Sequence, residues 1–350
     1  MIFAAVIGSG DEGPGKEPSR KDGPGGLPGQ PPVLSANAPQ IGIKTGARGT
    51  AKKPRAPRRI YKGWAPYLFF TPFLLLTAVF TLYPLFNAGV LAFYQTNGPA
   101  SRAFVGFGNF KHILSDPVFY KALWNTSTYA FFSVFLQLPL ALGLALLLNS
   151  DKSRAKGFFR LILFSPNLVG QIFVGILFGV LFTPRYGLIN QAIQALVGWG
   201  LNEQWLGNPD LVMPAIVITG LWMWVGFNMV YFLAALQSVD KSLEEAARID
   251  GASRSQVFWY VTLPSIRHVV VFVIVTSIIG SYQLFELPLA LLPVTEGHGP
   301  DNSGLTMILY LYDQGFAAGD LGLGSAVGWI IAAIIFSLSL LQIKLSNAAE

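Results

Sequence analysis

Two stretches of the sequence place amide, hydroxyl and aromatic side chains inside otherwise apolar runs, near 222–228 and near 277–286. Polar side chains are costly in hydrocarbon, so those retained there tend to face a cavity or a partner helix. Aromatic faces stack on C–H groups, and hydroxyls and amides form hydrogen bonds, which suits a sugar. The candidate pathway residues are Trp224, Gly226, Phe227, Asn228, Ser277, Gly280, Ser281, Tyr282, Gln283 and Glu286.

These residues leave other interpretations open. Small and hydroxyl side chains also pack membrane helices together, so packing and cavity roles both remain for Ser277 and Gly280. A cavity is favoured for Asn228, Gln283 and Glu286. Glu286 could also be the ion site of an ion-coupled secondary transporter, but such proteins normally show repeats and paired broken spans, and we find no convincing pair. A membrane enzyme would need clustered catalytic groups, which a lone Glu among amides does not supply.

The elements that must position these side chains are membrane-spanning helices. Of the 350 residues, 52% are hydrophobic and 12% are charged. A span needs about 20 mostly apolar residues, and six runs qualify. We therefore predict an all-α membrane protein with spans near 66–93, 125–149, 158–183, 211–237, 266–293 and 324–343. The absence of cysteine excludes disulfides and thiolate metal sites, and three separate histidines suggest no metal site.

The first 60 residues differ from the rest. They are rich in Gly and Pro without apolar periodicity, so we predict a disordered cytoplasmic tail ahead of a membrane domain at 61–350. Its basic end, Ala51–Lys62, is expected to contact anionic lipid headgroups. Gly10–Lys16 has the spacing of a phosphate-binding loop, but Glu17 follows instead of Ser or Thr and no strand precedes it. The tail is therefore not expected to bind ATP.

The distribution of basic residues predicts the orientation. With both termini in the cytoplasm, 20 of the 24 Lys and Arg residues fall on the inner side and 4 on the outer side. The asymmetry persists without the tail, at 9 against 4. Since cytoplasmic loops of membrane proteins carry the excess of positive charge, the segment between the fourth and fifth spans faces the cytoplasm.

That cytoplasmic segment, EEAARIDGASRSQVFWYVTLP from Glu244 to Pro264, predicts two short helices. Ser242–Glu245 and Ser253–Gln256 each read as a capping box. Gly251 lies between them, where positive φ would allow a sharp turn, and Pro264 restricts the exit into the fifth span. A solvated loop is the commoner explanation for a charged segment, but two caps, a glycine and an apolar stripe favour a docking surface.

The same segment resembles the EAA motif of binding-protein-dependent ABC importer permeases. The match is Glu245-Ala246-Ala247, three residues, Gly251, and then Val261-x-Leu263-Pro264. In that family the motif forms a coupling helix that sits in a groove of the ATPase subunit. The resemblance implies ATPase-coupling roles for Glu245, Ala246, Ala247, Asp250, Gly251, Val257, Phe258, Leu263 and Pro264.

The resemblance extends from about Tyr61 to Leu345 and is closest to sugar permeases of the maltose and glycerol-3-phosphate type. Phe104–Leu114, Gly187–Asn190 and Phe232–Ala246 are similar to family segments. The carboxyl end resembles the first permease of a pair. Two departures are Asp240 and His268, where the family usually has proline.

The resemblance implies the type I importer permease fold, with the coupling helix between spans four and five, and a bacterial or archaeal cytoplasmic (inner) membrane location. It also implies as partners a second permease subunit, an ATPase dimer that binds ATP and Mg, an extracytoplasmic sugar-binding protein and a sugar. No catalytic residue, cofactor or nucleic acid is expected for this chain. Outside the membrane, a stripe at Leu188, Ala192, Ile193 and Leu196 predicts an interfacial helix. The loop Thr295–Leu323 is expected to meet the binding protein.

Overall fold

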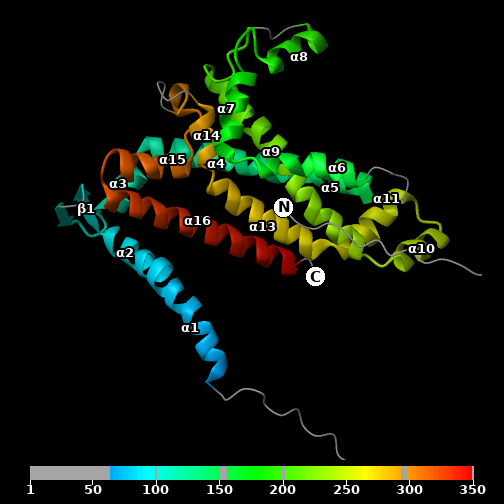
Figure 1. The fold of residues 1–350 in the computed structure, drawn as a ribbon, viewed down its shortest axis with the longest axis horizontal. Coiled ribbons are helices and arrows are strands. Elements are labelled where there is room, and N and C mark those ends of the chain that lie inside the picture. The colour runs from blue at the N-terminus through cyan, green and yellow to red at the C-terminus, as the bar shows by residue number, and fades with distance from the viewer. Residues whose placement is uncertain (1–63, 99–100, 150–155, 199–201, 293–297, 349–350) are drawn as a thin grey trace, which may run out of the picture. The chain divides into compact units, whose positions relative to one another are not determined.

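The computed structural model describes residues 64–98, 101–149, 156–198, 202–292 and 298–348. The predicted tail at 1–60, and its basic end, lie outside them. The described residues are mainly helical, with one small hairpin (Figure 1). The helices that make up most of the apolar stretches are α1 (Ala65–Thr77), α2 (Tyr83–Leu91), α4 (Pro117–Phe132), α5 (Leu138–Asn149), α6 (Lys156–Phe164), α7 (Gln171–Leu181), α9 (Pro209–Ser238), α13 (Arg267–Tyr282) and α16 (Leu321–Ala348).

Shorter elements connect them. They are β1 (Tyr94–Asn97), β2 (Ser101–Phe104), α3 (Gly108–Ser115), α8 (Leu188–Val197), α10 (Lys241–Ile249), α11 (Arg254–Val257), α14 (Glu286–Leu291) and α15 (Met307–Tyr312). Wide π turns η1 (Ala78–Leu82), η2 (Ser133–Gln137), η4 (Phe258–Thr262) and η7 (Asp313–Ala317) continue neighbouring helices, as do η3 (Ser165–Leu168) and α12 (Leu263–Ser265). The short 3₁₀ turn η6 (Pro300–Asn302) stands by itself. The helix predicted at 188–196 is present as α8, whereas the hairpin β1–β2 was not anticipated.

Within the described residues, four helical stretches are each long and apolar enough to cross a membrane: Tyr67–Leu91, Pro117–Asn149, Pro209–Ser238 and Leu321–Gln342. Two further pairs qualify together but are bent. Lys156–Leu168 meets Gln171–Leu181 at 98°, and Arg254–Ser265 meets Arg267–Tyr282 at 71°. If each bent pair counts as one span there are six, as the hydropathy predicts.

Two of the predicted spans are interrupted rather than continuous. In the third span, Val169 and Gly170 are extended, so α7 starts in a new direction. In the fifth, α13 ends at Tyr282, three residues intervene, and α14 begins at Glu286. The predicted continuous span 266–293 is therefore interrupted. An apolar run reports burial in lipid but not backbone direction, so hydropathy alone did not find either break.

Helices α7 and α14, the second halves of the two broken spans, pack against each other. Gly175 of α7 makes this possible, because a Cβ there would lie 2.7 Å from Ala290 Cβ and 2.9 Å from the Leu287 carbonyl oxygen of α14. Leu287 and Leu291 are fully or almost fully buried, in one core with Val174 of α7. The contact fixes the break in the fifth span relative to that in the third.

A second set of contacts packs α5 against α9 and α13 against α16. Ala141 and Ala145 of α5 are completely buried against Met229 and Phe232 of α9, and small side chains allow such close approach in membranes. Helix α13 lies beside α16 (Figure 1). By contrast, none of the apolar window of Tyr67–Leu91 is buried within the chain.

Hydrogen bonds hold residues 302–306 against α4 and against the break of the fifth span. Asn125 of α4 donates through Nδ2 to the carbonyl oxygens of Asn302, at 2.8 Å, and Leu305, at 3.0 Å. Thr306 Oγ1 in turn donates to the Leu284 carbonyl oxygen at 2.7 Å. These hydrogen bonds link α4, residues 302–306 and Leu284, which lies in the break between α13 and α14.

Candidate functional site

A cavity of about 250 Å³ opens where α4, η2, α7, α9 and α13 meet. It is smaller than other hollows of the described residues, but it draws polar side chains from several helices. Its walls mix amides, hydroxyls and aromatic rings. The lining residues are Tyr129, Ser133, Gln137, Gln171, Trp224, Phe227, Asn228, Thr276, Ser277, Gly280, Ser281, Gln283 and Leu284.

Irregular backbone places several of these side chains. In the π turn η2, the Leu138 N–H donates to the Ser133 carbonyl oxygen, five residues back. Single π turns inside α-helices are frequent at functional sites. Here the turn leaves both Ser133 and Gln137 on the cavity wall. Gln171 is the first residue after the bend of the third span, and Gln283 the first after α13. Each break therefore places an amide side chain on the cavity wall.

Most of the buried polar groups on this wall have no partner in the chain. Ser133, Gln137 and Asn228 are 6%, 4% and 6% exposed. None of their side chains forms a hydrogen bond with another of the described residues, and the same holds for Gln171 and Gln283. Buried polar groups normally have partners. A ligand or water in the cavity would satisfy them. Ser281 differs, since its hydroxyl donates to the Ser277 carbonyl oxygen at 2.8 Å.

The structure brings most of the predicted pathway residues together. Seven line the cavity: Trp224, Phe227, Asn228, Ser277, Gly280, Ser281 and Gln283. Three do not. Gly226 faces α6, where a Cβ would lie 1.6 Å from the Leu163 carbonyl oxygen, so it is a close-packing position. Tyr282 is buried, with its hydroxyl 2.9 Å from that of Ser127. Glu286 is exposed in the first turn of α14.

Six lining residues were not singled out from the sequence: Tyr129, Ser133, Gln137, Gln171, Thr276 and Leu284. Gln137 and Gln171 carried a usable signal, since each is an isolated amide in an apolar run of the second or third span. Tyr129 had none, because a tyrosine in a span is equally common at interfaces.

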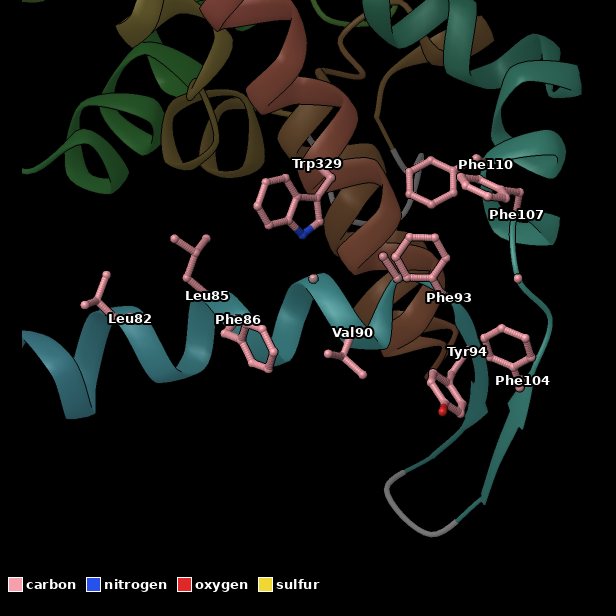
Figure 2. Close-up of a pocket in the computed structure, with 13 residues that line it drawn as sticks. Leu82, Leu85, Phe86, Val90, Phe93, Tyr94, Phe104, Phe107, Phe110 and Trp329 are labelled. Carbon is pink, nitrogen blue, oxygen red and sulfur yellow. The ribbon is translucent and has the colours of Figure 1, made fainter.

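The largest hollow is a different kind of site. It measures about 1280 Å³ and lies between α2, the hairpin, α3 and α16. Figure 2 shows Leu85, Phe86 and Val90 of α2, together with Phe107 and Phe110 from around α3 and Trp329 of α16. Nearly all its surface is hydrocarbon or aromatic carbon. It therefore offers few hydrogen bonds to a hydroxylated solute, and the smaller polar cavity is the better candidate.

The segment between the fourth and fifth spans forms two helices that meet at a sharp turn. Helix α10 ends at Ile249, and Gly251 has φ +88°, in the left-handed region. The Ala252 N–H donates to the Ala247 carbonyl oxygen at 2.9 Å, and the Gly251 N–H to that of Arg248 at 3.1 Å. This is a Schellman-type end that glycine favours. The turn predicted at Gly251 is confirmed.

Only one of the two predicted capping boxes is present. Ser253 and Gln256 form it reciprocally, at 2.8 and 3.4 Å. The box at Ser242 is wrong, because Asp240 is the N-cap of α10 and its Oδ1 accepts from the Ser242 N–H at 2.9 Å. That bond to the backbone, together with one from the Ser242 side chain, lowers the pKa of Asp240. The carboxylate replaces the expected hydroxyl cap.

A side-chain contact joins the two arms of the segment. Thr262 Oγ1 donates to Glu244 Oε1 at 2.9 Å, and Arg248 lies 3.6 Å from the other oxygen of Glu244. Glu244 is half-buried, and both of its carboxylate oxygens have partners.

The predicted docking residues divide by exposure. Glu245, Ala246, Asp250, Gly251 and Pro264 are exposed, while Ala247, Phe258 and Leu263 are half-buried. Val257 is 4% exposed, so its side chain packs within the chain. A shallow groove of about 310 Å³ runs past Ala247, Asp250 and Gly251. Among the described residues no His, Asp and Glu side chains cluster in a way that could hold a metal ion.

Comparisons with known proteins place the chain in a family. Residues 137–347 match the family described as binding-protein-dependent transport system inner membrane component. The arabinooligosaccharides transport system permease protein AraP of Bacillus subtilis is 38% identical over 284 residues, covering 81% of this chain and 89% of AraP. The lactose transport system permease protein LacF of Rhizobium radiobacter is 36% identical, covering 80% and 92%.

The fold is also that of a solved transporter. A chain of a bacterial ABC transporter involved in the import of the acidic polysaccharide alginate superposes with a TM-score of 0.71, covering 81% of this chain and 96% of that chain at 23% identity. This likeness confirms the predicted type I importer permease fold. The chain is a multi-pass membrane protein that belongs to the binding-protein-dependent transport system inner membrane components, the permease subunits of ABC importers.

Proposed function

We propose that this chain is one of two permease subunits of an ATP-driven importer for a sugar. It would form half of the translocation pathway in a cytoplasmic (inner) membrane, with both termini in the cytoplasm. The observation that supports this most directly is the polar cavity, with buried amides that have no partner in the chain beside the aromatic rings of Trp224 and Phe227. Sugar hydroxyls both donate and accept, so amides and hydroxyls are suitable partners.

The second part of the proposal concerns the energy source. The α10–α12 segment projects apolar side chains that the described chain does not cover: Ile249 is 86% exposed, Tyr260 79% and Trp259 58%. Clustered exposed apolar groups of this kind mark interaction sites. We assign this surface, with Glu245 and Gly251, to contact with a separate ATPase subunit that binds ATP and Mg. An extracytoplasmic binding protein would deliver the sugar on the opposite side.

In this cycle the chain performs no covalent chemistry. ATP-driven closure of the ATPase dimer draws the coupling segments together and favours an outward-open cavity. Hydrolysis then resets it inward. The two states differ in affinity for ATP and for the loaded binding protein, which is what alternating access requires. The Glu244–Thr262 bond ties α10 to the start of the fifth span, so movement of α10 is transmitted to the cavity wall at Ser277.

Uptake into vesicles tests the proposal. The complex would be reconstituted with ATP inside and binding protein outside, and uptake of labelled arabinotriose and lactose followed. The proposal predicts uptake that requires ATP and persists when proton and sodium ionophores collapse the gradients. Uptake that needs no ATP and stops with an ionophore would contradict it and favour ion coupling.

A further inference from the structure

The polar cavity carries no formal charge on its walls. Of its thirteen lining residues, none is Asp, Glu, Lys, Arg or His. Four are amides, from four separate elements: Gln137, Gln171, Asn228 and Gln283. We propose that this cavity selects neutral glycosides and excludes uronates and sugar phosphates, with Gln137 and Asn228 as the specificity-determining residues. The inference rests on the proposed import of a sugar and narrows its substrate class.

Burial makes these two amides informative. Gln137 and Asn228 are each more than nine-tenths buried, line the cavity and have no hydrogen-bond partner among the described residues. An amide presents both a carbonyl acceptor and an N–H₂ donor, which matches the hydroxyls of a neutral sugar. A structural role would have supplied such buried groups with partners inside the chain.

The aromatic residues support the same ligand. Trp224 and Phe227 meet edge to face, with ring centroids 5.8 Å apart and planes at 80°. Phe227 also stacks on Phe164, at 6.4 Å and 26°. These contacts hold the rings in place while both residues remain part of the cavity wall. Ring faces attract the C–H faces of a pyranose or furanose and offer nothing specific to a carboxylate or phosphate.

An anionic solute would find no compensation for its lost hydration here. A carboxylate or phosphate moved out of water needs a cation or several charge-assisted hydrogen bonds. The cavity wall supplies neither a lysine nor an arginine. A neutral oligosaccharide loses only hydroxyl hydration, which the amides and serines replace.

The absence of cysteine from the sequence permits a direct occupancy assay. Ser277→Cys places one thiol on the cavity wall, and Ser115→Cys places a matched thiol on exposed α3, outside the lining residues. The purified complex in nanodiscs would be labelled with a small maleimide, without binding protein, so that the selectivity of that protein does not contribute. The probes are arabinotriose and lactose as neutral sugars, and digalacturonate and sn-glycerol-3-phosphate as anions. Labelling in denaturant confirms that each thiol is present.

We expect a neutral probe to slow labelling of Ser277→Cys but not of Ser115→Cys, and the anions to leave both unchanged. Adding Asn228→Asp or Gln137→Glu should raise the neutral-sugar concentration needed for protection by about tenfold or more, because a buried carboxylate replaces an uncharged partner. Protection by an anion at equal or lower concentration would overturn the inference. So would failure of every neutral probe to protect in a complex whose ATP hydrolysis responds to one of them. If no sugar stimulated that hydrolysis, the proposed function itself would fail.

Discussion

The Thr262 hydroxyl donates a 2.9 Å hydrogen bond to the Glu244 carboxylate, across eighteen residues and the turn at Gly251. It joins α10, the first arm of the α10–α12 segment, to the start of the fifth span. Thr262 is buried and Glu244 half-buried, so solvent screens the bond only in part. The two arms can therefore move as one body.

Removing that bond should weaken coupling. Thr262→Val keeps the shape but removes the donor, which at about 1 kcal/mol for a net hydrogen bond predicts roughly a fivefold loss of binding-protein-stimulated ATP hydrolysis. Thr262→Ser retains the hydroxyl and should stay close to the parent. The comparison is made on purified complexes of equal subunit content. A loss in Thr262→Ser with none in Thr262→Val would show that the methyl group, and not the bond, matters.

The turn at Gly251 should tolerate substitution in an order set by the backbone. Nothing lies within 4 Å of a Cβ at this position, so strain at φ +88° is the main penalty. A left-handed conformation costs an L-residue about 1–2 kcal/mol, least for Asn. Transport should fall in the order Gly, Asn, Ala, Pro, since Pro also loses the N–H donated to Arg248.

Membrane insertion and ATPase assembly should persist in all three Gly251 variants, because no span is altered. The measurement is sugar uptake per ATP hydrolysed. Normal uptake by Gly251→Pro would remove the coupling role of this segment.

Substitution by alanine should lower the melting temperature at one of two glycines near the cavity and leave it unchanged at the other. Gly226→Ala would place Cβ 1.6 Å from the Leu163 carbonyl oxygen, so α9 and α6 must separate. Overpacking of this kind costs about 1–3 kcal/mol or more. Gly280→Ala meets nothing within 4 Å and should leave the melting temperature of the complex nearly unchanged. Similar melting temperatures for the two variants would contradict the assignment of Gly226 to packing.

The Asp240 cap predicts a pH dependence with a definite sign. Its pKa in the folded chain is lowered, so the cap stabilises α10 above the unfolded value of about 4 and is lost as pH falls through the lower folded pKa. Hydrogen exchange of the Ser242 and Leu243 amides should thus be protected at neutral pH and lose protection below pH of about 4 beyond the intrinsic change. Asp240→Asn keeps an acceptor without the titration, so it should flatten this dependence. An unchanged dependence in that variant would exclude Asp240 as its source.

The sequence predicted the parts of this structure that depend on composition and local pattern. The six predicted apolar runs correspond to four helices long enough to span a membrane and two bent helix pairs, and the Ser253–Gln256 box and the Gly251 turn follow from local backbone chemistry. The predicted box at Ser242 is absent because Asp240, two residues earlier, is the N-cap and accepts from the Ser242 N–H, so the helix starts before Ser242. Local rules do not decide between such adjacent candidates.

The cavity was only half predictable. Residues of the fourth and fifth spans were found because polar and aromatic side chains are dense there. Gln137 and Gln171 reach the cavity through a π turn and a 98° bend, which are set by packing between helices rather than by the residues themselves. The pairing of Gly175 with Ala290 is likewise a long-range contact that no local pattern reports. Glu286 was predicted to face the cavity from an unbroken fifth span, but the break places it at the exposed start of α14.

The most direct measurement is ATP hydrolysis by the purified complex in lipid, with and without its binding protein, across arabinotriose, lactose, diacetylchitobiose and glycerol-3-phosphate. We predict that an ATPase co-purifies with this chain and that the binding protein loaded with a neutral sugar stimulates its ATP hydrolysis. Hydrolysis that no loaded binding protein changes, or a chain that purifies without an ATPase, would contradict it.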